Sequence, residues 1–224
     1  MRVFISEVNP LLSESARDWD DLIEAVSPPA LLMVIASRMS PSLQRTTPPE
    51  DIWQEVLLHA WRDRLRCEWR GLKSFRSWLL TIIDHRIRRA AELQATLKRG
   101  GDIRMISESA FRSDGSTDDQ SDWAGPAGSV TPSRLAMYKE QAAAMQAALE
   151  ALPEEFRDVV RLRLFDQLTM EEIAEQLETT LGAVRYRFGR GAERYRQLLR
   201  SHLASEIRSL RSETTAHPSQ HSSP

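Results

Sequence analysis

The chain has 224 residues, of which 41% are hydrophobic and 28% charged, a balance that is typical of globular proteins and excludes wholesale disorder or collagen-like structure. No apolar run approaches the roughly eighteen residues of a membrane span. The N-terminal residues lack the pattern of a signal peptide, so the sequence predicts a cytoplasmic protein. A single cysteine, Cys67, excludes an internal disulfide and leaves no CxxC pair for zinc.

Charge is distributed unevenly along the chain. Thirty basic and thirty-two acidic side chains give a formal net charge of -2. Residues 61–99 nevertheless hold 11 basic and 4 acidic residues, and residues 185–200 hold 6 basic residues and 1 acidic residue. Most of these basic residues are arginines, whose planar guanidinium suits phosphates and guanine edges. One such block is typical of a solvated helix face, but two separate blocks in an otherwise acidic chain favour nucleic acid as the partner.

Helical periodicity dominates the first half of the chain. An apolar stripe over residues 19–26 predicts a helix that the Pro28-Pro29 pair ends or kinks, and residues 30–39 form a second apolar stretch. The Thr47-Pro48-Pro49 cluster predicts the start of a third helix. One side of that helix is apolar and can join a core, whereas the other side is polar and can stay in water. The apolar side comprises Ile52, Trp53, Val56, Leu57, Ala60 and Trp61, and the polar side comprises Asp51, Gln54, Glu55 and Arg62.

Gly71 predicts a loop over residues 68–75 that is anchored by aromatic side chains. We expect Phe75 and Trp78 to be core residues. A long helix is predicted from about Ser74 to Lys98, and its outer face is basic, with Arg76, His85, Arg86, Arg88 and Arg89. Residues 99–133 are rich in Gly, Ser and Asp and are predicted to form a flexible acidic linker, because they bury too little apolar surface to offset the entropy of ordering them.

The second half of the chain predicts four more helices. The first covers residues 135–152, and the second begins at Pro153 and is broken at 166–168. Thr169 and Glu172 have the spacing of a capping box. Residues 169–177 and 180–200 then form two helices joined by a tight turn, the second of them basic. This is the layout of a helix-turn-helix unit with a supporting and a recognition helix, although an ordinary helical hairpin with a basic surface is the alternative.

The predicted fold class is therefore all-α, with two small helical domains joined by a flexible acidic linker and a helix-turn-helix in the C-terminal domain. Residues 201–213 continue a weak apolar pattern that either extends the last helix or docks on another surface. The tail from Thr214 is predicted to be disordered.

Two parts of the chain resemble bacterial sigma factors, in particular the extracytoplasmic-function (ECF) group of the sigma-70 family. The resemblance to region four of that family lies in the segment LPEEFRDVVRLRLFDQLTMEEIAEQLETTLGAVRYRFGRGAERYRQLL. The resemblance to region two lies in PPEDIWQEVLLHAW and FRSWLLTIIDHRIRR. The matches cover residues 19–98 and 135–200 in the family's order. The implied organisation is an N-terminal extension (1–18), a region 2-like helical domain (19–98), the linker (99–133), a region 4-like helix-turn-helix domain (134–200) and a partly disordered C-terminal extension (201–224).

The resemblance implies a non-catalytic subunit that binds core RNA polymerase and directs it to promoter DNA, without a cofactor or metal. It assigns contacts with the beta-prime clamp helices to Asp51, Gln54 and Glu55, implies contact with the beta subunit, and allows an anti-sigma factor as a further partner. The positions that match the minus-ten side are Trp69, Arg70, Lys73, Arg76, His85, Arg86 and Arg89. The positions that match the minus-thirty-five side are Thr180, Arg185, Tyr186, Arg187 and Arg190.

The chain departs from the family pattern at several of these positions. The departures are Asp84, His85, Arg89, Glu178, Tyr186, Gly189 and Gly191. Asp84 and His85 stand where the family usually has Arg and Asn, and Glu178 replaces a turn glycine. Gly189 and Gly191 are expected to loosen the recognition helix, each at a cost of about 1 kcal/mol relative to alanine. The bases that the family reads are therefore not transferred to this chain.

Two other classes of function are alternatives to this interpretation. An enzyme is disfavoured because the sequence has no nucleophile elbow, phosphate-binding loop or HExxH motif, and His59 has no second histidine at ligand spacing. A stand-alone helix-turn-helix regulator that never binds polymerase is the second alternative. Co-purification with core polymerase distinguishes that regulator from a sigma factor.

Overall fold

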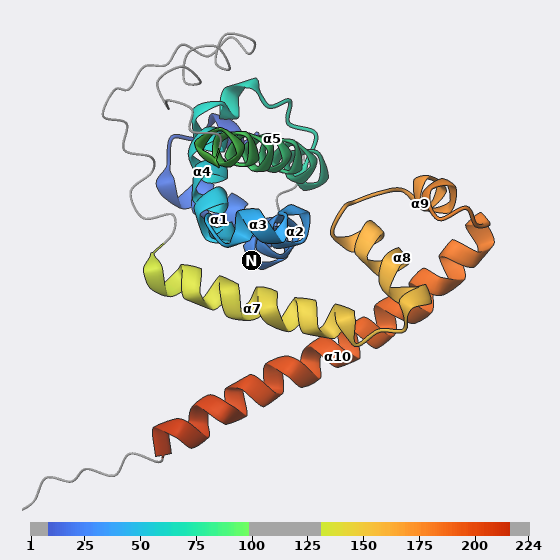
Figure 1. Ribbon diagram of the computed structural model, residues 1–224. Helices are drawn as coiled ribbons and strands as arrows, with labels where there is room; N and C mark the ends of the chain where they lie inside the picture. The colour runs from blue at the N-terminus through green and yellow to red at the C-terminus, as the bar shows by residue number, and fades with distance from the viewer. Residues whose placement is uncertain (1–8, 99–130, 216–224) are drawn as a thin grey trace, which may run out of the picture. The chain divides into compact units, whose positions relative to one another are not determined.

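The computed structural model describes residues 9–98 and 131–215, with side chains described up to residue 204. Within these ranges the regular secondary structure is entirely helical, which confirms the predicted fold class. Contacts divide the chain into two compact units, Met1–Tyr138 and Lys139–Pro224 (Figure 1). Most of the predicted linker and the end of the tail lie outside the described residues.

The first unit contains five α-helices before residue 99, together with two short 3-10 helices. The α-helices are α1 (Ala16–Ala25), α2 (Pro28–Arg38), α3 (Pro41–Gln44), α4 (Pro49–Arg62) and α5 (Leu72–Lys98), and the 3-10 helices are η1 (Pro10–Leu12) and η2 (Arg64–Arg66). Proline stands at the first position of α2, α3 and α4, where its missing N–H and fixed φ are tolerated. The Pro28-Pro29 pair thus begins α2, after α1 has ended and Ser27 has adopted a left-handed φ of 61°.

The core of the first unit is built on α4, which packs against α2 and α5. Trp53 of α4 and Phe75 of α5 are fully buried, which confirms Phe75 as a core residue. Trp19 of α1 meets Trp61 edge-on at 5.1 Å between ring centroids and meets Phe75 at 6.1 Å. Trp78 is half-buried beside Phe75 at 5.8 Å. This aromatic cluster joins three helices and fixes α4 against α5.

The second half of the chain contains four helices: α7 (Pro132–Glu150), α8 (Glu154–Leu164), α9 (Met170–Gln176) and α10 (Leu181–Thr215). Proline 153 is the N-cap of α8 and not its first helical residue. The last helix is longer than the predicted recognition helix, because residues 201–213 continue it without a break to Thr215. Of the two possibilities for that segment, helix extension is therefore the one observed.

The helix-turn-helix consists of α9 and the start of α10, packed on α8. Val159 and Leu162 of α8, Ile173 of α9 and Val184 of α10 form its buried core. Helix α9 begins with the predicted capping box: the Thr169 hydroxyl accepts from the Glu172 N–H at 3.2 Å, and the Glu172 carboxylate accepts from the Thr169 N–H at 2.6 Å. These bonds satisfy two N–H groups that would otherwise lack partners at the helix start.

Gly191 lies where α10 crosses α8. A Cβ atom at this position would lie 2.8 Å from Val160 Cγ2 and 3.0 Å from Phe156 Cβ, closer than carbon atoms pack. The glycine therefore permits the close approach of the two helices, a role that the sequence pattern did not predict. At Gly189, in contrast, an added Cβ would meet nothing within 4 Å.

Candidate nucleic-acid and polymerase interface

The polar face of α4 is exposed in the first unit. Asp51, Gln54 and Glu55 are all exposed, whereas Ile52 and Val56 on the opposite side are fully buried. The period of 3.6 residues separates the two sets on one helix. The three residues predicted to bind polymerase therefore share one solvent-facing surface, and none of them is needed for the core.

A tight turn precedes α5 and follows Trp69, one of the residues that match the minus-ten side. Gly71 adopts a φ of 97°, which is open to glycine but strained for other residues. The Ser74 hydroxyl accepts from the Arg70 N–H at 3.1 Å and donates to the Gly71 carbonyl at 3.0 Å. Trp69 is half-buried, with its ring 6.2 Å from that of Phe75. Helix α5 begins at Leu72, so the second half of the predicted loop is helical.

The basic residues predicted on the minus-ten side differ in exposure. Arg70, Lys73 and His85 are exposed, whereas Arg76, Arg86 and Arg89 are partly buried. Arg70 forms an ion pair with Glu68 at 2.8 Å, with both side chains more than two-thirds exposed. An exposed ion pair of this kind contributes little to stability, so it exchanges readily for a phosphate. The exposed members of the set thus lie at the surface of the first unit.

Asp84, one of the expected departures from the family pattern, has a local partner. Arg38 Nη1, at the C-terminal end of α2, donates to Asp84 Oδ1 at 2.8 Å. This ion pair joins α2 to α5 across the surface of the first unit. Asp84 therefore serves the packing of the two helices and leaves His85 beside it exposed.

His59, which has no second histidine at ligand spacing, lies in a cluster of arginines. Arg62 Nη2 lies 2.9 Å from His59 Nδ1, and Arg86 Nη1 lies 2.9 Å from His59 Nε2. Burial and the charges of Arg86 and Arg62 lower the pKa of His59 to about 4. The spacing of His59 and Arg62 on one helix face was the available sequence signal, whereas the approach of Arg86 from α5 depends on tertiary packing.

The recognition helix presents its predicted residues in three ways. Thr180 is the N-cap of α10, where its hydroxyl accepts from the Ala183 N–H at 3.2 Å. Arg185, Tyr186 and Arg190 are exposed, with Tyr186 63% exposed, and Arg187 is partly buried. Arg185 lies 3.7 Å from the Glu171 carboxylate of α9, with both side chains about two-thirds exposed. The exposed donors therefore lie on the surface opposite the helix-turn-helix core.

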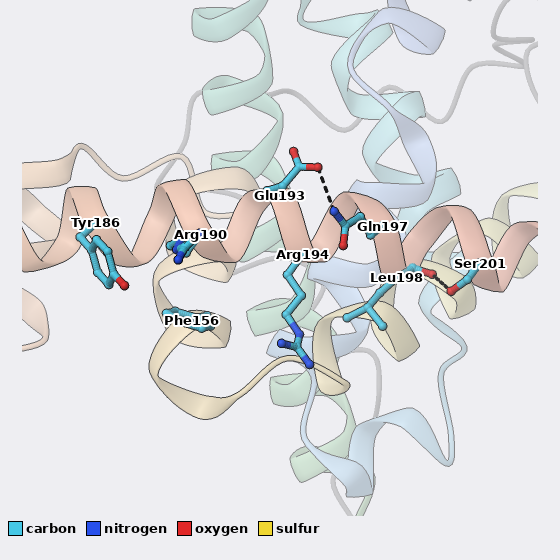
Figure 2. A pocket seen from close by; sticks show the side chains of 8 residues that line it. All are labelled: Phe156, Tyr186, Arg190, Glu193, Arg194, Gln197, Leu198 and Ser201. Carbon is cyan, nitrogen blue, oxygen red and sulfur yellow. Dashed lines mark hydrogen bonds between the residues drawn. The ribbon is translucent and has the colours of Figure 1, made fainter.

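A groove of about 700 Å³ runs beside α10 in the second unit. Figure 2 shows Tyr186 and Arg194 projecting from α10 on the side of Phe156 of α8, while Glu193 points away and accepts from Gln197. The groove continues to Leu198 and Ser201. Its lining combines aromatic and guanidinium groups, which are the side chains that stack on bases and bind phosphates.

The described part of the chain has neither a membrane-spanning helix nor a metal-binding cluster. Among residues 9–98 and 131–215, no helix has the length and apolarity needed to cross a bilayer. In the same ranges, no group of three or more His, Cys, Asp or Glu residues is placed to hold a metal ion. Cys67 is buried, and burial raises the pKa of its thiol.

Comparison with known families agrees with this arrangement. Residues 30–95 match the family model "Sigma-70 region 2", and residues 142–194 match "Sigma-70, region 4". The ECF RNA polymerase sigma-E factor of Escherichia coli K12 is 28% identical over 143 residues, which are 64% of this chain and 69% of that protein. The protein of the same name from Salmonella typhimurium LT2 gives the same identity and coverage. The ECF RNA polymerase sigma factor SigE of Mycolicibacterium smegmatis is 37% identical over 84 residues, which are 38% of this chain and 33% of that protein.

The two matched regions lie one in each unit and follow the order of the family. The first covers most of α2 to most of α5, and the second covers the end of α7, all of α8 and α9, and the first part of α10. The chain belongs to the sigma-70 family, as an RNA polymerase sigma factor of the extracytoplasmic-function type.

Proposed function

We propose that this sigma factor binds core RNA polymerase through the polar face of α4 and holds promoter DNA with both of its units. The observation that carries the proposal is that the chain has two such surfaces, one in each matched region, in the same order along the sequence as in the family. An exposed polar face lies in the region 2 match, and a capped, basic helix-turn-helix lies in the region 4 match. As a sigma factor the chain directs promoter recognition, and catalysis remains with the polymerase.

The proposed polymerase contact is made by Asp51, Gln54 and Glu55. Two carboxylates and an amide on one exposed helix face suit a basic or polar partner helix, and we assign this partner to the beta-prime clamp helices. We further propose that the second unit contacts the beta subunit, that the protein acts in the cytoplasm, and that an anti-sigma factor is a further partner.

The proposed minus-ten contacts lie around the turn before α5. Trp69 would offer an aromatic wall to an unstacked base, as single-strand binding requires. Arg70, Lys73 and His85 are exposed near or along α5 and would contact phosphates or base edges, together with Arg76, Arg86 and Arg89. The expected strength of these contacts falls as the salt concentration rises, because phosphate binding releases counterions.

The proposed minus-thirty-five contacts are made by the start of α10 in the major groove. Arg185 would exchange its exposed ion pair with Glu171 for a guanine edge, where a bidentate contact discriminates by about 1–3 kcal/mol. Tyr186, Arg187 and Arg190 follow on the same helix. Thr180, as the N-cap, would place the first N–H groups of α10 toward a backbone phosphate.

The test of this function is run-off transcription with purified core polymerase. Adding the chain should start transcripts at a defined promoter, and changing Asp51, Gln54 and Glu55 together to alanine should abolish both initiation and co-purification with core. A matched triple variant, Glu14, Arg17 and Asp21 to alanine, removes three exposed charges elsewhere in the first unit and should initiate normally. Specific duplex binding without any complex with core would instead identify a stand-alone regulator.

A further inference from the structure

One cluster in the first unit holds more hydrogen-bond donors than its own residues can accept. His59 of α4 lies between Arg62 of the same helix and Arg86 of α5, with a guanidinium nitrogen 2.9 Å from each ring nitrogen. A neutral imidazole has one acceptor nitrogen and one N–H, and a guanidinium group only donates. The two contacts therefore cannot both be hydrogen bonds, and one of them brings two donors face to face.

The charges around His59 are also unbalanced. Arg86 is partly buried, and within the described residues its Nε is buried without a hydrogen-bond partner. Burial lowers the pKa of Arg86, and the nearby charges of Arg89 and Arg62 lower it further, while Glu55 and Asp63 oppose that effect. The carboxylate of Asp63 is shared, at 3.6 Å from Arg62 and 3.5 Å from Arg66. Among the described residues whose charges shift the pKa of His59, three are arginines (Arg86, Arg62 and Arg89) and one is a carboxylate, Asp63.

We propose that His59, Arg62, Arg86 and Arg89 form a binding site for one backbone phosphate of promoter DNA, so that α4 contacts DNA as well as polymerase. The proposal rests on the function proposed above. A phosphate offers several oxygens to the converging donors, and arginine forks match its geometry. Its charge would also relieve the repulsion between the three guanidinium groups.

Charge along α4 favours DNA over polymerase as the occupant. The first two turns of α4 carry Glu50, Asp51 and Glu55, whereas the last turn carries His59 and Arg62. A polymerase surface that complements the acidic turns would repel the arginine cluster, and a DNA phosphate would be attracted to it.

The experiment measures the affinity of the holoenzyme for fluorescent promoter DNA with a single-stranded minus-ten segment, at several salt concentrations. Arg62→Gln should weaken binding roughly three- to tenfold and lower the slope of log K against log salt by about 0.7–0.9, the value for one lost phosphate contact. The affinity of the Arg62→Lys holoenzyme should lie between those of the wild-type and Arg62→Gln holoenzymes. Arg17→Gln, which removes an exposed arginine from α1, should change neither quantity. The side chain of Arg62 is 44% exposed, so its substitution should leave folding intact, which the melting temperature checks.

A second arm locates the phosphate on the DNA. Each minus-ten phosphate is replaced in turn by an uncharged methylphosphonate, and one replacement should weaken wild-type holoenzyme but not the Arg62→Gln holoenzyme. Equal losses in both proteins at every position would overturn the proposal. Loss of core binding by Arg62→Gln would also overturn it, because the cluster would then be a polymerase contact.

A third arm uses the full chain alone with inorganic phosphate and follows the imidazole NMR signals of His59 against chloride at equal ionic strength. Phosphate should move these signals in wild type and much less in Arg62→Gln. If phosphate moves these signals but Arg62→Gln leaves the salt slope of DNA binding unchanged, the cluster is a general anion site. This result would contradict a binding site for a DNA phosphate. If the wild-type chain fails to bind core, the proposed function fails, while this titration still decides whether the cluster takes a phosphate.

Discussion

Gly191 and Gly189 lie two residues apart in α10, and the structure predicts opposite outcomes when each is changed to alanine. Both substitutions add one methyl group and remove the conformational entropy cost of a helical glycine, which gains about 1 kcal/mol at an open site. At Gly189 an added Cβ would meet nothing within 4 Å. Gly189→Ala should therefore stabilise the second unit by about 0.5–1 kcal/mol.

Gly191→Ala brings the same gain in conformational entropy, but it also has a steric cost. The added Cβ would lie 2.8 Å from Val160 Cγ2 and 3.0 Å from Phe156 Cβ, and Val160 is fully buried. A β-branched side chain in a helix has few rotamers, and a Cβ moves only with its backbone, so α8 and α10 must separate. Overpacking of this kind costs about 1–3 kcal/mol. The two variants should therefore differ by about 1–3 kcal/mol, with Gly191→Ala the less stable.

The assay is urea unfolding of the full chain, followed by far-UV circular dichroism and by tryptophan fluorescence. All six tryptophans precede residue 139, so fluorescence reports the first unit and not the second. Both glycine variants should shift the part of the dichroism transition that belongs to the second unit and leave the fluorescence transition unchanged. Equal stabilisation by both alanines would refute the close crossing of α8 and α10.

Three further predictions concern single groups. Thr169→Ala removes one half of the capping box and should destabilise the second unit by about 1 kcal/mol in the same urea assay, and no loss would contradict the cap. Glu178 follows α9 with a φ of 48°, so Glu178→Gly should be neutral or stabilising by up to about 1 kcal/mol, whereas Glu175→Gly within α9 should destabilise by about 1 kcal/mol. Because the pKa of His59 is lowered from 6.5 to about 4, its neutral form contributes stability that is complete above pH 6.5 and is lost as the pH falls toward 4. Stability measured against pH should therefore decline less steeply in this window for His59→Gln than for wild type, and parallel curves would contradict the shift.

Much of the fold follows from local sequence patterns. The apolar and polar residues of α4 alternate with helical period, so both the buried face and the exposed face could be predicted without knowing the neighbours. The capping box at Thr169 likewise involves residues only three positions apart, and the structure confirms it. Such features involve only residues that are close in sequence, so they can be predicted without knowledge of the tertiary structure.

Other features depend on contacts that periodicity does not encode. Helix α3 has four residues, too few to give a periodic signal. The approach of Arg86 to His59 joins residues 27 positions apart, and the closeness of α8 to Gly191 depends on how the two helices cross. For the candidate site, the sequence predicted the exposed residues of α4 and three of those on α10, because exposure follows from the helical face, whereas Arg187 is partly buried. It could not rank the basic residues of α5 by burial, since Arg86 and Arg89 face α4 only after packing.

The most direct test of the central claim is to map transcription start sites in vitro on genomic DNA, with core polymerase alone and with core plus this chain. We expect a new set of starts that appears only with the chain and lies downstream of two shared sequence elements at constant spacing. Arg185→Ala should weaken the dependence on the upstream element only. A start-site pattern identical to that of core polymerase alone would contradict the assignment of this chain as a sigma factor that directs initiation.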